Sequence, residues 1–124
     1  TFQITNCDSL TSLEGLNKLT TVSGPFTIDK NEGLLNLDAL QALSAVTKLQ
    51  IRDNLGLLSI TGLSGLIGTL DGDVIIDGNP VLSSLQGLQG LVEVTGSLTI
   101  ADCDALTSLT GLQNLKTVGK NIFS

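Results

Sequence analysis

Residues 74–97 read VIIDGNPVLSSLQGLQGLVEVTGS, and the same arrangement of apolar residues returns along the whole chain. Aligned on itself, the chain divides into five coils at 2–25, 26–48, 49–73, 74–97 and 98–121, here numbered coils 1 to 5, and Ile122 begins a sixth. The coils have 24, 23, 25, 24 and 24 residues and share the pattern L-x-I-x-x-N-x-x-L-x-x-L-x-G-L-x-x-L-x-x-V-x-x-x. A repeat that fills all 124 residues predicts a single solenoid domain over 1–124.

Each coil opens with two apolar residues separated by one position, which is typical of a half-buried strand. After this pair the apolar residues come at every third position, as at Leu10, Leu13 and Leu16. On an α-helix each three-residue step would rotate the apolar stripe by about 60°, so the stripe would wander around the helix. We therefore expect short extended or turn-like pieces with inward side chains. The opening pairs are Phe2 and Ile4, Phe26 and Ile28, Leu49 and Ile51, Val74 and Ile76, and Leu98 and Ile100.

Strands from successive coils are expected to stack about 4.8 Å apart in a parallel sheet, with each inward Leu resting on its counterpart one coil away. The predicted fold class is an all-β-rich solenoid, a right-handed parallel β-helix of about five 24-residue coils with a leucine-rich-repeat-like pattern. The pattern begins and ends without caps. We therefore expect a fragment of a longer protein, whose open ends are covered by native flanking sequence or by end-to-end self-association.

The sixth position of the pattern is the most diagnostic row, because it holds only Asn or Cys. An Asn here can bond backbone groups of the following turn and of the next coil, and Cys can fill the same small site. Both cysteines are therefore predicted to be buried and structural. Four coil steps also place them roughly 19 Å apart, too far for a disulfide. The row consists of Cys7, Asn31, Asn54, Asn79 and Cys103.

The spacing around this row is seen in Val94-Thr-Gly-Ser-Leu98-Thr-Ile100-Ala-Asp-Cys103-Asp-Ala-Leu106. It has one residue more before the strand, and one more after Cys103, than the ordinary leucine-rich repeat. Over the whole chain it resembles the receptor L domain, the Leu-rich right-handed β-helix of insulin-receptor and EGF-receptor ectodomains, and repeats of fungal cell-wall glycoproteins and microbial surface proteins. The resemblance implies an extracellular or cell-surface location. The receptors' ligand-contact residues have no recognisable motif here, so none is carried over.

Two departures from these relatives favour a microbial or simpler surface protein over a receptor ectodomain. The chain has only two cysteines, both in the internal row, whereas receptor L domains carry disulfide-bonded caps. It also has no N-x-S/T sequon, which the glycosylated relatives would lead us to expect.

Composition argues against several classes of function. The 12 acidic and 6 basic residues give a net charge of −6, which would repel nucleic acid from most of the surface. No apolar run approaches the length of a membrane span, so we expect no membrane insertion by this segment. The chain has no His, no G-x-S-x-G and no phosphate-binding Gly loop, so we predict no enzyme activity, no cofactor and no metal site.

The outward positions of the predicted strands form the candidate binding surface. A parallel sheet presents them as one face, where the charged members could give polar specificity to a protein or glycan contact. The alternative is a merely solvated face. The first row is Gln3, Thr27, Gln50, Ile75 and Thr99, and the second row is Thr5, Asp29, Arg52, Asp77 and Ala101.

These observations predict a non-catalytic recognition or adhesion module that binds a protein or glycan through the outer strand face or the flanking turns. The competing hypothesis is a rigid structural spacer of a cell-surface or cell-wall protein. Two weaker alternatives are Ca²⁺ binding by Asp71, Asp73 and Asp77, around the one-residue insertion of coil 3, and ice binding. Ice binding would favour a regular Thr row, and here Gln50 and Ile75 interrupt it.

Overall fold

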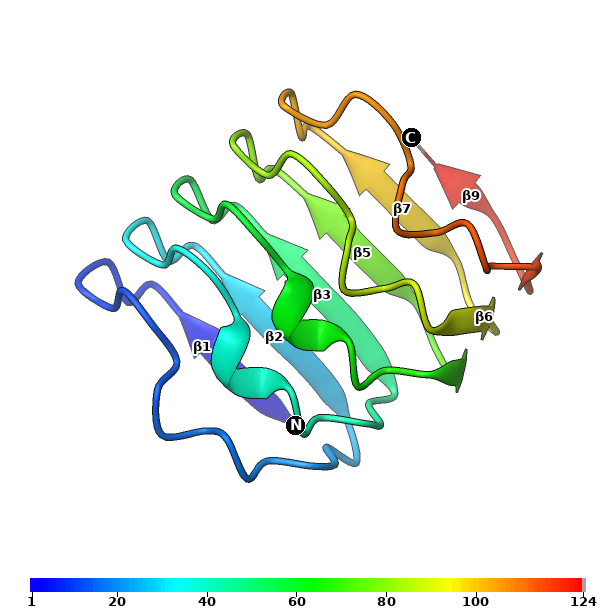
Figure 1. Cartoon of the computed structure of the whole chain (residues 1–124), viewed down its shortest axis with the longest axis horizontal. Helices are drawn as coiled ribbons and strands as arrows, with labels where there is room; N and C mark the ends of the chain where they lie inside the picture. Colours follow the sequence, from blue (N-terminus) through cyan, green and yellow to red (C-terminus); the bar gives the residue numbers. More distant parts are fainter. Residues whose placement is uncertain (124) are drawn as a thin grey trace.

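The computed structural model describes residues 1–123, which form a parallel β-solenoid of five coils (Figure 1). Each of the five coils contributes one strand, and Ile122–Phe123 adds a sixth, to a six-stranded parallel sheet in the order β1-β2-β3-β5-β7-β9. The register pairs Phe2 with Phe26, Leu49 with Val74, and Leu98 with Ile122, so the predicted alignment of the coils is confirmed. The strands are β1 (Phe2–Thr5), β2 (Pro25–Asp29), β3 (Lys48–Arg52), β5 (Val74–Asp77), β7 (Leu98–Ala101) and β9 (Ile122–Phe123).

A second, smaller parallel sheet was not predicted from the sequence. It contains β4 (Gly68–Leu70), β6 (Leu91–Val94) and β8 (Thr117–Val118), in that order. In coils 1 and 2 the corresponding segments meet only in an isolated bridge between Thr21 and Ala45. These strands come at the end of each period-3 segment, where the spacing of apolar residues gives no alternation by which to recognise a strand.

The period-3 segments form chains of tight turns. Leu40 donates its backbone N–H to the carbonyl of Leu37 (3.0 Å), and Leu43 donates in the same way to Leu40 (2.9 Å). Because a 3₁₀ turn has three residues, a Leu at every third position points inward at every turn. Two of these turns are short 3₁₀ helices, η1 (Asp38–Leu40) and η2 (Thr61–Leu63). The predicted turn-like pieces are confirmed, and no α-helix occurs within residues 1–123.

The core lies between the six-stranded sheet and the Leu turns, and it is completed by contacts between neighbouring coils. Leu34, Leu40 and Leu43 of coil 2 are fully buried, whereas their counterparts in coil 1 are only half-buried. At the opposite end Leu109 is 56% exposed. A coil therefore buries its apolar side chains fully only when it has a neighbour on both sides. The counterparts in coil 1 are Leu10, Leu16 and Leu19.

A residue in the left-handed backbone conformation follows each of the strands β1, β2, β3, β5 and β7 and turns the chain out of the strand. The φ angle is positive at the fifth position of all five coils. Asn, Asp and Gly tolerate this conformation better than other residues, and four of the five coils use one of them. Coil 2 instead has Lys30, with a φ of 57°. The five residues are Asn6, Lys30, Asp53, Gly78 and Asp102.

Replacing Lys30 by Gly should raise the free energy of unfolding by about 0.5–1 kcal/mol, because Gly adopts the left-handed conformation without steric strain. The measurement is the midpoint and slope of urea unfolding. Lys30→Ala is the control, because it removes the same charge and keeps the strained Cβ. An equal gain in stability for Lys30→Ala would show that charge, and not backbone conformation, limits stability here.

Candidate binding surface

The predicted outward rows lie side by side on the outer face of the six-stranded sheet. The backbone pairs Thr5 with Asp29, Asp29 with Arg52, and Arg52 with Asp77, in unbroken register. The alternating strand residues Phe26 and Ile28 are fully buried on the inner side. The structure thus brings together all the candidate residues on one face, which we call the outer strand face: Gln3, Thr5, Thr27, Asp29, Gln50, Arg52, Ile75, Asp77, Thr99 and Ala101.

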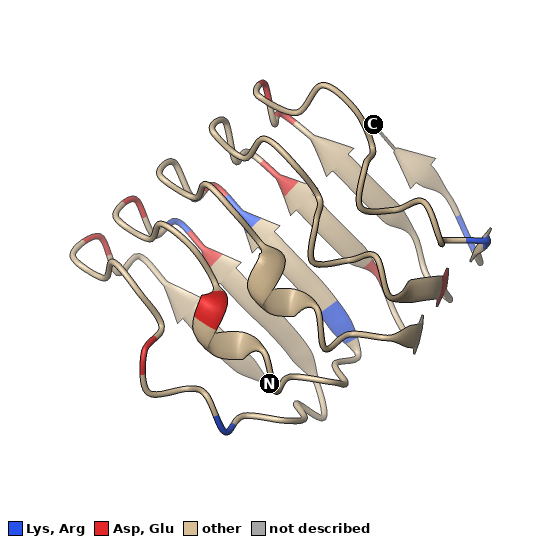
Figure 2. Ribbon diagram, viewed as in Figure 1, with Lys and Arg blue, Asp and Glu red and all other residues tan. Residues whose placement is uncertain are grey.

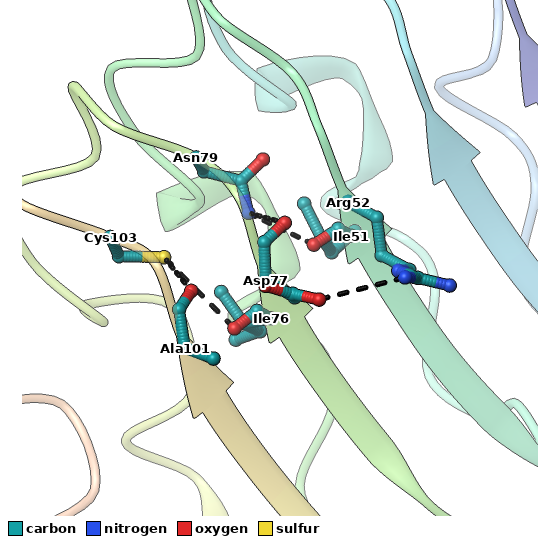
Figure 3. Close-up of polar contacts among 7 residues, drawn as sticks. All are labelled: Ile51, Arg52, Ile76, Asp77, Asn79, Ala101 and Cys103. Atoms are coloured by element: carbon teal, nitrogen blue, oxygen red, sulfur yellow. Dashed lines mark hydrogen bonds and ion pairs between the residues drawn. The ribbon is translucent and has the colours of Figure 1, made fainter. Parts of the chain in front are cut away.

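The centre of this face carries charges of alternating sign in a line across three strands (Figure 2). A guanidinium nitrogen of Arg52 lies 3.6 Å from a carboxylate oxygen of Asp77 (Figure 3). Thr27 donates its hydroxyl to Gln50 (3.2 Å). The two charged side chains are 44% and 26% exposed. An ion pair so open to solvent stabilises the fold by at most about 1 kcal/mol. Both charges are therefore accessible to a partner at little loss of fold stability.

Two polar atoms at one edge of the face have no partner. Thr5 Oγ1 and Asp29 Oδ1 are buried from solvent and make no hydrogen bond to any residue that the structure describes. The two residues are paired across β1 and β2, so these atoms belong to neighbouring positions of the same row. Buried polar atoms without partners are uncommon in folded proteins, and a bound group or water can satisfy them. Asp29 therefore keeps one buried oxygen without a partner, whereas Arg52 and Asp77 are the charges of the row whose side chains are 44% and 26% exposed.

The sixth-position row forms a hydrogen-bonded ladder beneath the turns. Asn54 donates its backbone N–H to Oδ1 of Asn79 (3.1 Å), and Asn31 donates in the same way to Asn54 (3.1 Å). Each Asn also donates its side-chain amide to a carbonyl of the preceding coil, as from Asn79 to Ile51 (2.9 Å) in Figure 3. All three Asn are fully buried. The predicted structural role of this row is confirmed for its Asn members.

The two cysteines differ from each other, and the prediction that both are buried is wrong for Cys7. Cys103 is buried, and its thiol lies 3.2 Å from the carbonyl oxygen of Ala101. Burial raises the pKa of this thiol, and hydrogen bonds from Asn79 only partly oppose the shift. Cys7 is exposed because no coil of residues 1–123 lies on its outer side. Neither cysteine is in a disulfide, as the spacing predicted.

The three carboxylates considered for Ca²⁺ are held apart. Asp71 accepts a hydrogen bond from the Thr95 hydroxyl (2.9 Å), Asp73 accepts one from the Ser97 backbone (2.8 Å), and Asp77 pairs with Arg52. Within the described chain, no group of three or more His, Cys, Asp and Glu side chains is placed to hold a metal ion. The structure therefore does not assemble these carboxylates into a metal centre.

The outer strand face is the candidate site, and the case for it rests on its geometry, because the comparisons with known proteins add nothing to it. Over residues 1–123 no helix has both the length and the apolar character needed to cross a membrane. No family model, curated protein or solved structure matches this chain.

Proposed function

We propose that this chain is a non-catalytic recognition or adhesion module that binds a protein or glycan through the outer strand face. The observation that carries the proposal is the row of Asp29, Arg52 and Asp77, which places charges of alternating sign on three adjacent strands, with Arg52 and Asp77 partly exposed to solvent. Such a row offers both donors and acceptors at fixed spacing, which suits the polar groups of a protein or a sugar.

The expected setting is extracellular or at a cell surface. Support for this setting comes from the resemblance of the coil pattern to receptor L domains and microbial surface repeats. In that setting the regular face would be displayed on a rigid support, because the strands are stacked in register over a continuous core.

The second candidate function is that of a rigid spacer without a ligand of its own. The continuous ladder of Asn31, Asn54 and Asn79 favours it, because its hydrogen bonds join coils 1 to 4 along the solenoid axis. In a spacer, the exposed apolar side chains of the last coil, such as Leu109, would make end-to-end contacts.

Replacing Asp29, Arg52 and Asp77 together by Ala should weaken binding about 30-fold or more, since central charged contacts commonly contribute at least 2 kcal/mol to an interface. The measurement is binding of the chain to a printed glycan array and to a panel of purified cell-surface ectodomains. The thermal melting temperature should change little, because the Arg52–Asp77 pair is solvent-exposed.

The matched control replaces Asp8, Glu14 and Lys18 by Ala, which changes the net charge by the same amount on exposed turns of coil 1. This control should bind like the unmodified chain. Equal binding by the face variant would rule out the outer strand face as the site. If the unmodified chain bound none of the probes, the spacer would be the better account.

A further inference from the structure

The outer sides of the two central strands, β3 and β5, carry charges of opposite sign. β3 begins with Lys48 and ends with Arg52, and alternation with its two buried residues sends both side chains outward (Figure 2). Arg52 is paired in register with Asp77 at the end of β5. The same register, continued one residue before β5, sets Asp73 beside Lys48. Each basic residue of β3 therefore has an acidic neighbour at the same height along the strands.

The charges of these two strands are not used up by contacts within the chain. The side chains of Arg52 and Asp77 pair at 3.6 Å but remain 44% and 26% exposed. Lys48 makes no ion pair with any of the residues 1–123. One carboxylate oxygen of Asp73 accepts the backbone N–H of Ser97 (2.8 Å), which leaves the second oxygen for another donor. The two strands can therefore take charged partners from outside the chain.

This arrangement is complementary to itself under a two-fold rotation. The axis runs parallel to the strands, midway between β3 and β5, just above the sheet. Rotation about it lays β3 of a second copy over β5 of the first and keeps the height of every residue along the strands. Arg52 then faces Asp77 of the second copy, and Lys48 faces its Asp73. A two-fold interface requires this kind of self-complementary surface.

The positions around the central strands do not oppose the same arrangement. Asp29 on β2 faces Ala101 of the second copy, so no two like charges meet directly. Asp29 is diagonal to Asp77 of the second copy, and Arg52 lies between them. The rotation also sets neutral side chains against each other: Thr27 against Thr99, and Gln50 against Ile75.

The size of the face is sufficient for a weak dimer. Six strands about 4.8 Å apart, with four or five residues of about 3.3 Å each, give a face of roughly 29 by 15 Å. Two such faces bury about 900 Å² together, near the lower limit of about 1,000 Å² for a specific interface. Packed sheets lie about 10 Å apart, a gap that an Arg or Lys side chain and a carboxylate bridge together. Display of many copies on one surface would strengthen such weak contacts.

We propose that the outer strand face binds the same face of a second copy of this chain in a two-fold dimer. Across the interface Arg52 and Asp77 of the two copies form a group of four charges that alternate in sign. Each carboxylate gains a second guanidinium, and each guanidinium a second carboxylate. This inference rests on the proposed function, because it names the protein partner of the same face.

The test begins with sedimentation of the chain at increasing concentrations. The unmodified chain should form a reversible dimer with a dissociation constant of about 0.1 mM, as its small area implies. Arg52→Glu makes two acidic side chains face each other across the interface, and Asp77→Lys makes two basic side chains do so. Each variant should weaken its own dimer about 10-fold or more.

The decisive measurement is a one-to-one mixture of these two variants. In a mixed dimer every acidic position at this height faces a basic position of the other copy. The mixture should therefore associate within about 3-fold of the unmodified chain. The milder changes Arg52→Gln and Asp77→Asn keep the two chains close to the native fold. Each should weaken the dimer about 3-fold, and their mixture should show no recovery.

Two control variants change the charge by the same steps on exposed turns of coil 1. Lys18→Glu matches Arg52→Glu, and Asp8→Lys matches Asp77→Lys. Both should dimerise like the unmodified chain. Melting temperatures measured by circular dichroism confirm that all the variants are folded.

Three results would overturn the inference. A chain that stays monomeric up to about 1 mM has no such dimer; if it still binds a glycan or an ectodomain through the outer strand face, the proposed function stands with a different partner. A dimer that neither charge reversal weakens is formed by another surface, such as the ends of the solenoid. Charge reversals that weaken the dimer without recovery in the mixture would exclude the two-fold pairing of Arg52 with Asp77.

Discussion

Replacing Gly62 by Ala should lower the free energy of unfolding by about 3 kcal/mol, because a methyl group at this buried position has no space. Gly62 lies in η2 of coil 3, and a Cβ there would overlap the carbonyl oxygen of Leu37 in coil 2. The φ angle at Gly62 is not in the left-handed region, so the effect tests the close approach of two coils and not backbone conformation. Relief would require separating coils whose Leu37 and Leu63 side chains are fully buried.

The measurement is urea unfolding followed by circular dichroism, with Ser64→Ala as the control. Ser64 is exposed two residues further along, so its substitution should change stability by less than about 0.5 kcal/mol. A stability loss for Gly62→Ala no larger than for Ser64→Ala would mean that the coils can move apart freely at η2. That result would contradict tight stacking of backbone on backbone at this position.

Gly62 also illustrates which role of a glycine can be predicted from a sequence pattern and which cannot. Recurring glycines indicate turns, and Gly62, Gly87 and Gly111 do recur at the fourteenth position of their coils. At all three, however, a Cβ would overlap a carbonyl oxygen of the preceding coil. Gly15, with no preceding coil beside it, has open space around a Cβ. Contact between layers is thus the reason for glycine at Gly62, and only the stacked structure reveals it. At Gly15, Gly87 and Gly111 the positive φ angles of 107°, 121° and 114° also favour glycine.

The register of the coils and the outer strand face could be predicted because both follow from the spacing of apolar residues. Once Phe2, Phe26 and Leu49 are aligned, alternation along each strand sends Asp29 and Arg52 to the outer side. The pairing of Arg52 with Asp77 then follows from the same register. Which of these residues binds a partner could not be predicted, because a solvated face and a binding face have the same pattern.

The features that the sequence did not predict depend on local deviations from the repeat. The second sheet is interrupted beside Ala45, where coil 3 is one residue longer and its strand β4 pairs with β6 of coil 4 but not with coil 2. The insertion is visible in the sequence, but the displacement of the backbone that it causes is not. The exposure of Cys7 also depends on its place in the first coil, since Cys103 in the same row is buried.

Replacing Asn54 by Leu should lower the free energy of unfolding by about 4 kcal/mol, because two buried backbone groups lose partners at a cost of about 1–3 kcal/mol each. Asn54 is fully buried at the middle of the ladder. Its Oδ1 accepts the backbone N–H of Asn31 (3.1 Å), and its side-chain amide donates to the carbonyl of Ile28 (3.0 Å). Leu has a similar size but can form neither hydrogen bond, so burial of the extra apolar surface offsets only part of the loss.

The measurement is the free energy of unfolding from urea titration, with Cys7→Ala as the control in the same row. Cys7 is exposed, and its thiol makes one hydrogen bond within the described chain, to the Thr5 carbonyl (3.4 Å), so this change should cost less than about 1 kcal/mol. Asn54→Cys should fall between the two, because Cys fits this row at Cys103 but bonds more weakly than Asn. If Asn54→Leu were as stable as the unmodified chain, the ladder would not hold the coils together, and packing of the Leu core alone would account for their stacking.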